Sequence, residues 1–552
     1  MKKIFFALLS ASMVLFAACQ PAGPEVSDEA QVIEARDASY EVTVTSTGAW
    51  TLEGEYDWMT PSATKGNGGE KITFTARVNL TELIRTAEYT LKQNGGETVI
   101  TLYQKGIAPD ASVSISLVEK TETDARFALS YSTAIEADYK EYGIYYNTEP
   151  NIETATRVVK GTDMAAGVKV VDLEGLTAGK VYFVWPYVQT IDVVEVVGGM
   201  IGLLEPKTVS DINELQKVID AAEEYQEVRV VAGTYSTAVN GILQLRNNVT
   251  VSGGWNAEFT AQEGYTVIDG QQVKTCVNIA DDVKGATIKN LELINTDNNA
   301  KGAVTTYGAD ATIVNCYVHD NKLGGDCGAV YIGGGNATVA NCRVVKNEAN
   351  GHGTGVFAAS GSNVKVVNCL IAENLSSKTG GYYGGLILKG GCGVVVNNTI
   401  VKNRCYDETG QSWPNNGNRD GGWVKAYNNV IAGNLARIKT TEEWTIQRDQ
   451  WYFQTWDGNC EFQNNLIQGG KKGGISDGEW DKNIVVVRDY DLSTLFTDYE
   501  NGDYTLKAGA ACVDKGNGSN ANVAGLIGVY NTDLAGKPRV KGTVDCGCYE
   551  IQ

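Results

Sequence analysis

The sequence predicts an all-β protein whose C-terminal half is a coil of stacked short strands. Segments of the 552-residue chain repeat one pattern, in which an alternating β-branched strand meets an asparagine and a second short strand follows. The repeated asparagines are Asn315, Asn341, Asn368 and Asn397, at steps of 26, 27 and 29 residues. A fixed period of this size indicates a repeat architecture, and period-2 alternation without helical spacing indicates strands.

The asparagine series extends beyond these four positions, to Asn290 before them and to Asn428 and Asn464 after them. Asparagine tolerates the left-handed backbone conformation better than most residues, so each of these positions predicts a bend. If each coil stacks on the last, equivalent residues become neighbours about 4.8 Å apart. The sequence therefore predicts a parallel β-helix.

The repeat resembles the right-handed β-helix family that includes the pectate lyases, over roughly residues 228–552. Residues 210–222 have helical spacing with Ser210 or Asp211 as the N-cap, which resembles the N-terminal cap of secreted β-helix proteins. Residues 538–550 resemble the closing motif of bacterial surface β-helices, with Cys546 and Cys548 in place of small or aliphatic residues. The predicted domain is 210–552, and its resemblance implies a fold that many functions share.

Two small β-sandwiches are predicted before the β-helix. Residues 30–106 alternate between turns, and the phrases Gly48-Ala-Trp50 and Trp58-Met-Thr-Pro61 resemble a BACON-type domain. Such domains are associated with carbohydrate-active proteins, although we expect Trp50 and Trp58 to pack in the core. Residues 110–206 contain Leu173-Glu-Gly-Leu-Thr-Ala-Gly-Lys-Val-Tyr182, which resembles the late-strand signature of fibronectin type III domains. Both domains are interpreted as spacers.

The N-terminus has the pattern of an export signal. A basic start precedes an apolar run that ends in Leu15-Phe-Ala-Ala-Cys19. This resembles a bacterial lipobox, with Phe16 where the family usually has leucine. The resemblance implies a signal peptide at 1–18, a lipid on Cys19, a tether at 19–29 and an outer-membrane-anchored lipoprotein facing the cell surface or the periplasm. An ordinary signal peptide with a chance cysteine is the alternative.

The charge balance restricts the partners. The formal net charge is −20 at pH 7, which argues against binding of the nucleic-acid backbone. An acidic chain of this kind is typical of a soluble exported protein. The predicted partners are a polysaccharide, from the host or its diet, and the membrane through the N-terminal lipid.

Cysteines recur in one register of the repeat. There are 12, so eleven remain if Cys19 is acylated, and an odd number cannot pair fully within one chain. Cys316, Cys342 and Cys369 each follow a bend asparagine. We expect an inward stack of thiols that serve as small hydrophobic residues, because stacked strands hold them slightly too far apart for an easy disulfide. A redox role is the alternative.

One strand of each coil is predicted to carry a ligand-binding row. Where Val330, Val356 and Leu386 point inward, alternation turns Tyr331, Phe357 and Ile387 outward. Exposed aromatic residues in a row suit the apolar face of a sugar ring. The resemblance places the substrate cleft over this same strand, so Tyr331 and Phe357 are predicted to bind substrate.

The loops before this strand lengthen along the chain, over 322–328, 348–354, 375–384, 404–422 and 435–461. Six of the ten tryptophans lie between 413 and 480, and Trp413 and Trp451 are predicted to form a glycan platform or a wall of a groove. Burial of these rings within their own loops is the alternative. Asp326, His352 and Tyr382 each lie four residues before an inward residue, so they are predicted to line one corner of the coils, where Asp326 and Tyr382 would bind substrate.

The candidate catalytic residues are His352, Lys389 and Arg419. Histidine is a natural general base near neutral pH, and the resemblance implies Arg or Lys as the base of a lyase, often with Ca²⁺ held by aspartates. The sequence contains no dense aspartate cluster, so no cofactor is evident and a calcium site lacks support. Asp326 and Asp420 are three coils apart, too far for an inverting hydrolase. In the alternative interpretation, His319 and His352 are ordinary surface residues.

These observations predict a cell-envelope lipoprotein that binds an extended glycan along the β-helix. Cleavage of that glycan by a lyase or glycosidase reaction stays open. The alternative function is that of a non-catalytic adhesin or structural surface protein, with the β-helix as a rod.

Overall fold

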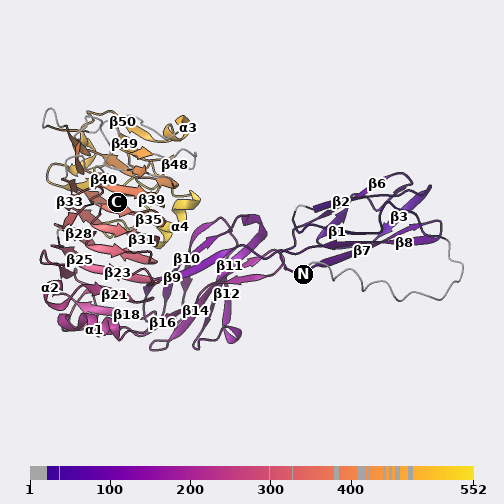
Figure 1. Ribbon diagram of the computed structural model, residues 1–552, viewed down its shortest axis with the longest axis horizontal. Helices are drawn as coiled ribbons and strands as arrows, with labels where there is room; N and C mark the ends of the chain where they lie inside the picture. The colour runs from indigo at the N-terminus through magenta and orange to yellow at the C-terminus, as the bar shows by residue number, and fades with distance from the viewer. Residues whose placement is uncertain are drawn as a thin grey trace.

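The computed structural model describes residues 22–552 except 37, 298, 326, 378–383, 408–416, 420–421, 439–442, 447–449, 454–459 and 470–475. Two sandwiches lie to one side of a long solenoid, as Figure 1 shows. The fold class predicted from the sequence is confirmed: the described residues are mainly strands, arranged as two sandwiches and a stack of parallel coils. No helix among the described residues has the length and apolarity to cross a membrane.

The first sandwich packs two sheets around Trp50, Phe74 and Tyr89, which are buried. Its larger sheet consists, in spatial order, of β1 (Ala30–Ile33), β8 (Gly96–Gln104), β7 (Arg85–Gln93), β3 (Ala49–Glu53) and β5 (Lys65–Asn67). Its smaller sheet consists of β2 (Ala38–Thr43), β6 (Lys71–Ala76) and β4 (Met59–Pro61). Trp58 is also buried, beneath the Arg85 guanidinium at 4.3 Å, so the core-packing prediction for both tryptophans is confirmed.

The second sandwich packs around Phe127, Ile144 and Val184. One sheet consists of β13 (Gly167–Leu173), β10 (Ala125–Ser132) and β9 (Ser112–Lys120). The other consists of β12 (Thr156–Gly161), β11 (Tyr139–Asn147), β14 (Tyr182–Thr190) and β15 (Glu195–Val197), with β16 (Ile201–Leu203) also paired to β14. Short 3₁₀ turns span Glu136–Asp138 and Ile152–Thr154.

The solenoid is built from four parallel-stacked sheets, here named A to D. Sheet A consists of β17 (Lys207–Val209), β18 (Glu227–Val231), β21 (Thr250–Trp255), β24 (Ala286–Lys289), β27 (Ala311–Val314), β31 (Gly335–Ala340), β35 (Ser362–Val367), β39 (Cys392–Val396), β43 (Val424–Tyr427) and β48 (Cys460–Gln463). Sheet B consists of β19 (Thr234–Ser236), β22 (Thr266–Asp269), β25 (Leu291–Ile294), β28 (Tyr317–His319), β32 (Arg343–Val345), β36 (Leu370–Ala372), β40 (Thr399–Val401), β44 (Val430–Ala432), β49 (Leu466–Gln468) and β50 (Ile484–Val486).

The other two sheets complete each coil. Sheet C consists of β20 (Leu243–Gln244), β23 (Val277–Ile279), β26 (Val304–Thr306), β30 (Val330–Ile332), β34 (Val356–Ala358), β38 (Leu386–Lys389), β42 (Gly417–Arg419) and β47 (Tyr452–Phe453). Sheet D consists of β29 (Lys322–Gly324), β33 (Glu348–Asn350), β37 (Leu375–Ser376), β41 (Arg404–Asp407), β45 (Leu435–Ile438) and the antiparallel β46 (Trp444–Ile446). The strands of sheet D lie in segments that the sequence predicted to be loops. They are short and polar, so they lack the alternating pattern that identifies a strand.

The bend prediction is confirmed at every asparagine of the series. All seven adopt a positive φ of 51° to 58°, the left-handed region: Asn290, Asn315, Asn341, Asn368, Asn397, Asn428 and Asn464. The register pairs Ala311 with Ala337 and Ala337 with Val364, so the asparagines that follow form one column. A second left-handed bend separates sheets B and D, and Asp320, with φ of 51°, is one of its members.

Buried asparagine ladders run inside the coils. In one ladder Asn321, Asn347, Asn374, Asn403 and Asn434 each donate from Nδ2 to the side-chain oxygen of the next coil, at 2.8–3.0 Å, and Gln450 ends the series. The same oxygens accept the backbone N–H of the coil below, for example that of Asn347 at 3.1 Å from Asn374. Buried polar groups are stable only when they are hydrogen-bonded. Here each asparagine accepts the hydrogen bonds of the buried N–H groups in the neighbouring coil.

Both ends of the solenoid are capped. Helix α1 (Leu215–Asp220) follows a 3₁₀ turn at Ile212–Glu214 and buries Leu215 and Ile219 against the first coil. Asp211, not Ser210, is the cap, because its carboxylate accepts from the Asn213 N–H at 3.0 Å. At the other end α3 (Asp477–Trp480) packs Trp480 against the core. Helix α2 (Thr237–Asn240) lies beside the early coils.

The C-terminal segment folds back over sheet B. It contains a 3₁₀ turn at Leu492–Thr494, the hairpin of β51 (Phe496–Asp498) and β52 (Asp503–Leu506), and helix α4 (Ala521–Val529). Its closing motif buries Arg539, which donates to the Asp545 carbonyl at 2.5 Å. Glu550 accepts from the N–H groups of Lys541 and Asp545, so the acids of this motif hold backbone amides in place.

Helix α4 joins the second sandwich to the solenoid. It packs against β13 on one side and against Val367, Val396 and Tyr427 of sheet A on the other. A Cβ at Gly525 would overlap the Val168 carbonyl oxygen, so only glycine permits this approach. Figure 1 shows α4 in the angle between the sandwich and the coils.

Asn374→Ala is expected to lower the free energy of unfolding by about 3 kcal/mol, since it leaves the buried backbone N–H of Asn347 without its acceptor and removes the bonds that Asn374 makes with the Asn347 side chain and the Val344 carbonyl. Asn363→Ala is the matched control, because this exposed asparagine makes its outer-face bond to Asn336 at 3.2 Å. Urea unfolding followed by tryptophan fluorescence compares the two. Equal losses in both variants would contradict the ladder's role.

Candidate functional site

The outer face of sheet C carries one continuous column of side chains. The register places them one above another, in the order Gln244, Asn278, Thr305, Tyr331, Phe357 and Ile387. The first three are linked by hydrogen bonds, from Asn278 Nδ2 to Gln244 Oε1 at 2.8 Å and from Thr305 Oγ1 to Asn278 Oδ1 at 2.9 Å. The column is therefore polar at its beginning and aromatic in its middle.

The aromatic middle is less open than the sequence predicts. The rings of Tyr331 and Phe357 stack with centroids 5.4 Å apart and planes at 19°, so each covers a face of the other. Phe357 is only 3% exposed and Ile387 1%, because the backbone at Gly353 lies against both. The prediction that Phe357 offers an open face to a sugar ring is wrong: alternation sets its direction, but the preceding loop covers it.

The open end of the stack lies at Tyr331 and Tyr307. Tyr307 is 45% exposed and its ring centroid is 6.1 Å from that of Tyr331, at an interplanar angle of 53°. Lys301 places its Nζ 5.8 Å from the Tyr331 ring centroid. Sequence reasoning missed Tyr307, whose only signal was its position directly after the alternating strand Val304–Thr306.

Two of the basic candidates occupy neighbouring strands toward the far end of sheet C. Lys389 is two residues after Ile387, so it lies on the same outward face, and it pairs in register with Arg419. The side chain of Arg419 lies outside the described residues. His352 is half-buried in the loop over Phe357, next to Gly353, and its carbonyl accepts from the Cys327 N–H at 3.1 Å.

Several predicted site residues are not part of the described structure. Asp326, Tyr382 and Trp413 lie outside the described residues, as does Asp420, so their roles stay predictions. Trp451 is described, and it is 2% exposed in the solenoid core, with its ring centroid 5.9 Å from that of Phe462. The prediction that Trp451 belongs to an exposed platform is wrong. The neighbouring Gln450 accepts from Asn434 at the end of the inner ladder, so this part of the loop lies inside the solenoid.

A second aromatic group lies on sheet D. Trp444 meets Tyr406 edge to face at 5.2 Å, and the guanidinium of Arg404 lies 5.6 Å from the Trp444 ring centroid. Arg437 lies over Tyr406 at 5.2 Å. The aromatic and guanidinium groups of this cluster alternate, and all of them are half-buried.

His319 is placed away from sheet C. It ends β28 on sheet B, where its ring lies between the carboxylates of Glu292 at 2.9 Å and Asp320 at 2.7 Å. Its ring also stacks on Tyr317 at 3.8 Å. Within the described part of the chain, no three His, Cys, Asp or Glu side chains are grouped to hold a metal ion.

The cysteine prediction is confirmed. Cys316, Cys342 and Cys369 stack inside the coils, with the Cys316 N–H 3.4 Å from the Cys342 sulfur, and none of the eleven cysteines among the described residues forms a disulfide. Asn398 continues this column, accepting from the Cys369 N–H at 2.9 Å. Burial raises the pKa of the Cys276 and Cys512 thiols to about 12, so they stay protonated near neutral pH.

The comparisons identify two parts of the chain. Residues 247–436 match the family model described as a right handed beta helix region, and residues 48–105 match that of BACON, a putative binding domain. The chain joins a BACON domain to a right-handed β-helix. No curated protein of similar sequence was found.

Solved structures with partial similarity include enzymes that act on polysaccharides. The Bacteroides ovatus GH5 xyloglucanase is 24% identical over 16% of this chain and 21% of its own, with a TM-score of 0.14, so the chain spans about a fifth of that enzyme. The Yersinia enterocolitica family 28 exopolygalacturonase is 11% identical over 69% of this chain and 96% of its own (TM-score 0.23). The Erwinia chrysanthemi pectate lyase PelI is 13% identical over 68% and 91%, respectively (TM-score 0.18).

Ellman's reagent at pH 8 is expected to label one thiol quickly in the folded protein lacking residues 1–21. Cys392 is the half-buried cysteine, whereas the other ten are buried. Burial keeps the reagent from the other thiols, and a raised pKa also keeps those of Cys276 and Cys512 protonated, so the buried thiols should react only after unfolding in urea. Cys392→Ser should remove the fast phase; a fast phase that persists would contradict the described burial.

Proposed function

We propose that the protein is a cell-envelope lipoprotein that binds an extended glycan along the outer face of sheet C. The observation that carries this proposal is the open end of the aromatic column, where Tyr307 and Tyr331 lie beside Lys301. Aromatic rings bind the apolar faces of sugars, and the exposed Gln244 and half-buried Asn278 amides of the same column suit their hydroxyl groups, whereas Thr305 is buried.

The regular spacing of the coils supports an extended ligand. Equivalent side chains in sheet C recur once per coil, about 4.8 Å apart. A chain of sugars laid along the solenoid would meet first the polar residues, then Tyr331, and then Lys389 beyond the covered Phe357. The BACON domain and the names of the similar solved enzymes agree with a glycan ligand, and the lipid on Cys19 would anchor the chain to the membrane.

Lys389 and Arg419 are the residues that would support cleavage of the bound glycan. A lyase abstracts a proton with a basic residue, and these two positions are neighbours on adjacent strands. A non-catalytic adhesin is the second candidate function, favoured by the burial of Phe357 and Ile387, since buried side chains cannot contact a substrate.

Tyr307→Ala combined with Tyr331→Ala is expected to weaken retention on immobilised polysaccharide by at least about tenfold, because it removes both tyrosine rings at the open end of the stack. Affinity electrophoresis against a panel of neutral and acidic polysaccharides measures this. Tyr103→Ala, at a half-buried tyrosine of the BACON domain, is the matched control. Unchanged retention in the double variant would place the glycan elsewhere.

A lyase reaction would produce a rise in ultraviolet absorbance from unsaturated uronates when the protein is mixed with acidic polysaccharides. Lys389→Ala should abolish that rise while leaving retention on the same polysaccharide measurable, because a base acts on the bound substrate. The absence of any rise across acidic glycans that the protein retains would favour the adhesin.

A further inference from the structure

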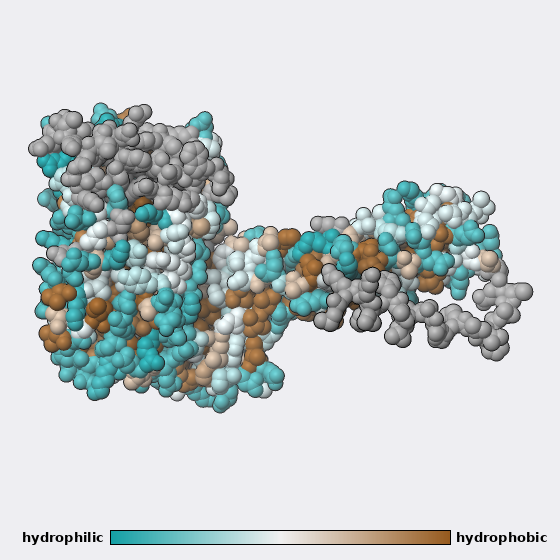
Figure 2. Space-filling view, viewed as in Figure 1, coloured by the Kyte–Doolittle hydropathy of each residue, from teal (hydrophilic) through white to brown (hydrophobic). Residues whose placement is uncertain are grey.

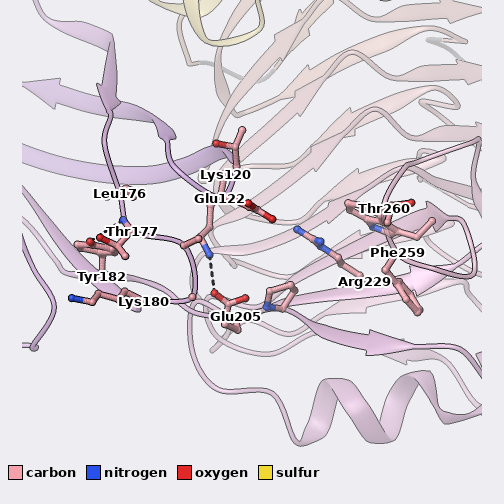
Figure 3. A pocket seen from close by; sticks show the side chains of 15 residues that line it. Lys120, Glu122, Leu176, Thr177, Lys180, Tyr182, Glu205, Arg229, Phe259 and Thr260 are labelled. Atoms are coloured by element: carbon pink, nitrogen blue, oxygen red, sulfur yellow. Dashed lines mark hydrogen bonds and ion pairs between the residues drawn. The ribbon is translucent and has the colours of Figure 1, made fainter.

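A cleft lies where the second sandwich meets the first coils of the β-helix. It has a volume of about 360 Å³. The sandwich contributes the β9–β10 turn, the loop before β14 and the segment before β17, and the β-helix contributes β18 and the end of β21. Figure 3 shows side chains from both domains turned into this space. Ligand sites occur preferentially at domain interfaces, and this volume is within the range of small-ligand pockets.

The β-helix wall consists of an arginine held on a tryptophan. The Arg229 guanidinium lies 4.3 Å from the Trp255 ring centroid, and its Nε donates to Glu227 at 3.0 Å. Glu227 is fixed in turn by Lys289 at 2.8 Å. Because these contacts lie behind the guanidinium, its end is directed into the cleft toward Glu122 (Figure 3). The Trp255 indole is held by its own bond from Nε1 to Ser252 Oγ at 3.0 Å.

The loop after Trp255 is fixed in a strained conformation. Phe259 lines the cleft with φ of 55°, a left-handed conformation that is rare for a bulky side chain. The Asn256 side chain holds this loop, accepting from the Thr260 N–H at 2.9 Å and donating to Thr260 Oγ1 at 3.0 Å. Strain of this kind persists only where the surroundings impose it, and it gathers at ligand sites.

The charges in the cleft oppose those of the whole protein. Three basic residues line it, Lys120, Lys180 and Arg229, against the two acids Glu122 and Glu205, although the chain has a formal net charge of −20. Lys120 is 3.6 Å from Glu205, whose side chain is 60% exposed. Lys120 is 20% exposed, but water reaches this long ion pair through Glu205, so an incoming anion can replace Glu205 as the partner of Lys120.

We infer that this cleft is a second ligand site, separate from sheet C, which binds a sugar ring that carries one anionic group. The rings of Trp255 and Phe259 would contact the apolar face of the sugar, and the hydroxyls of Thr177 and Thr260 are at hand for its hydroxyl groups. Arg229 and Lys120, on opposite walls, would bind the anion, which is either a carboxylate or a sulfate.

The test is isothermal titration calorimetry of the mature chain with three probes: cellotriose, its C6-carboxylated form and its 6-O-sulfated form. We expect at least one anionic form to bind at least about tenfold more tightly than cellotriose, and the better of the two identifies the anion. Trp255→Ala and Arg229→Gln should each weaken that binding by about tenfold or more. Arg246→Gln, at an exposed arginine of the same end of the β-helix that does not line the cleft, should leave it unchanged.

Two further variants separate this inference from the proposed function. Tyr307→Ala combined with Tyr331→Ala should leave binding of the anionic probe unchanged, because those rings belong to sheet C. Arg229→Lys, which keeps the charge beside Glu227, controls for loss of folding. Equal binding of cellotriose and both anionic forms, no binding by either anionic form, or full binding by Trp255→Ala would each overturn the second site while leaving the proposal for sheet C standing.

Discussion

The register between successive coils is the constraint on which every other feature depends. A parallel coil turns sharply at each bend, and the amide groups of those bends face inward, where no water is available to them. The buried asparagines solve this by repetition: Asn374 serves the backbone of Asn347 below and is itself served by Asn403 above. A ladder of this kind requires every coil to keep the same bend at the same height. The outward columns of sheet C then follow, because inner and outer residues alternate along the same strands.

The register also determines which faces are free for ligands. Sheets A and B both carry apolar residues on their outer sides, and both are covered by the chain itself. Helix α4 packs on Val367, Val396 and Tyr427 of sheet A. The C-terminal segment covers sheet B, with Phe496 and Tyr504 in a cluster that includes Leu370, Val401 and Val430. Figure 2 shows hydrophobic residues along the sandwiches and beside their junction with the coils. Sheet C carries an outer column that is polar at its beginning and aromatic in its middle, with the exposed Tyr307 beside Tyr331, so this face suits a hydrated ligand.

The repeat, the bends and the thiol stack could be predicted from the sequence because each is local. The regular spacing of the bend asparagines identifies them in the sequence, and Cys342 directly follows Asn341 in the same short pattern. Exposure could not be predicted in the same way. Alternation fixes the outward direction of Phe357, but whether it meets solvent depends on how Gly353 in another segment lies over it. Trp451 was misjudged for a related reason, since a tryptophan-rich loop can equally well return to the core.

The interdomain cleft shows the limit of sequence reasoning most clearly. Lys120, Glu205 and Trp255 belong to separate strands and loops of two domains, and no spacing along the chain connects them. What brings them together is the docking of the second sandwich, in which Gly525 lets α4 approach β13 and Lys365 of sheet A reaches Ser130 at 3.5 Å. Burial at this junction lowers the pKa of Lys365, so the contact places a cation in a partly dry environment. The sequence predicted this sandwich to be a spacer, and that prediction did not include its contacts with the β-helix.

The link between the two sandwiches is of a different kind. Arg77 and Arg85 both approach Asp192, at 2.8 and 3.5 Å, and Arg36 meets Asp138 at 2.6 Å. The Asp192 and Asp138 side chains are only 4% and 6% exposed, so buried carboxylates of the second sandwich join it to arginines of the BACON domain. Docking of the second sandwich relies instead on a packed helix and a glycine that fits one carbonyl oxygen. The second sandwich therefore packs directly on the β-helix, and a ligand bound in the cleft would contact both domains.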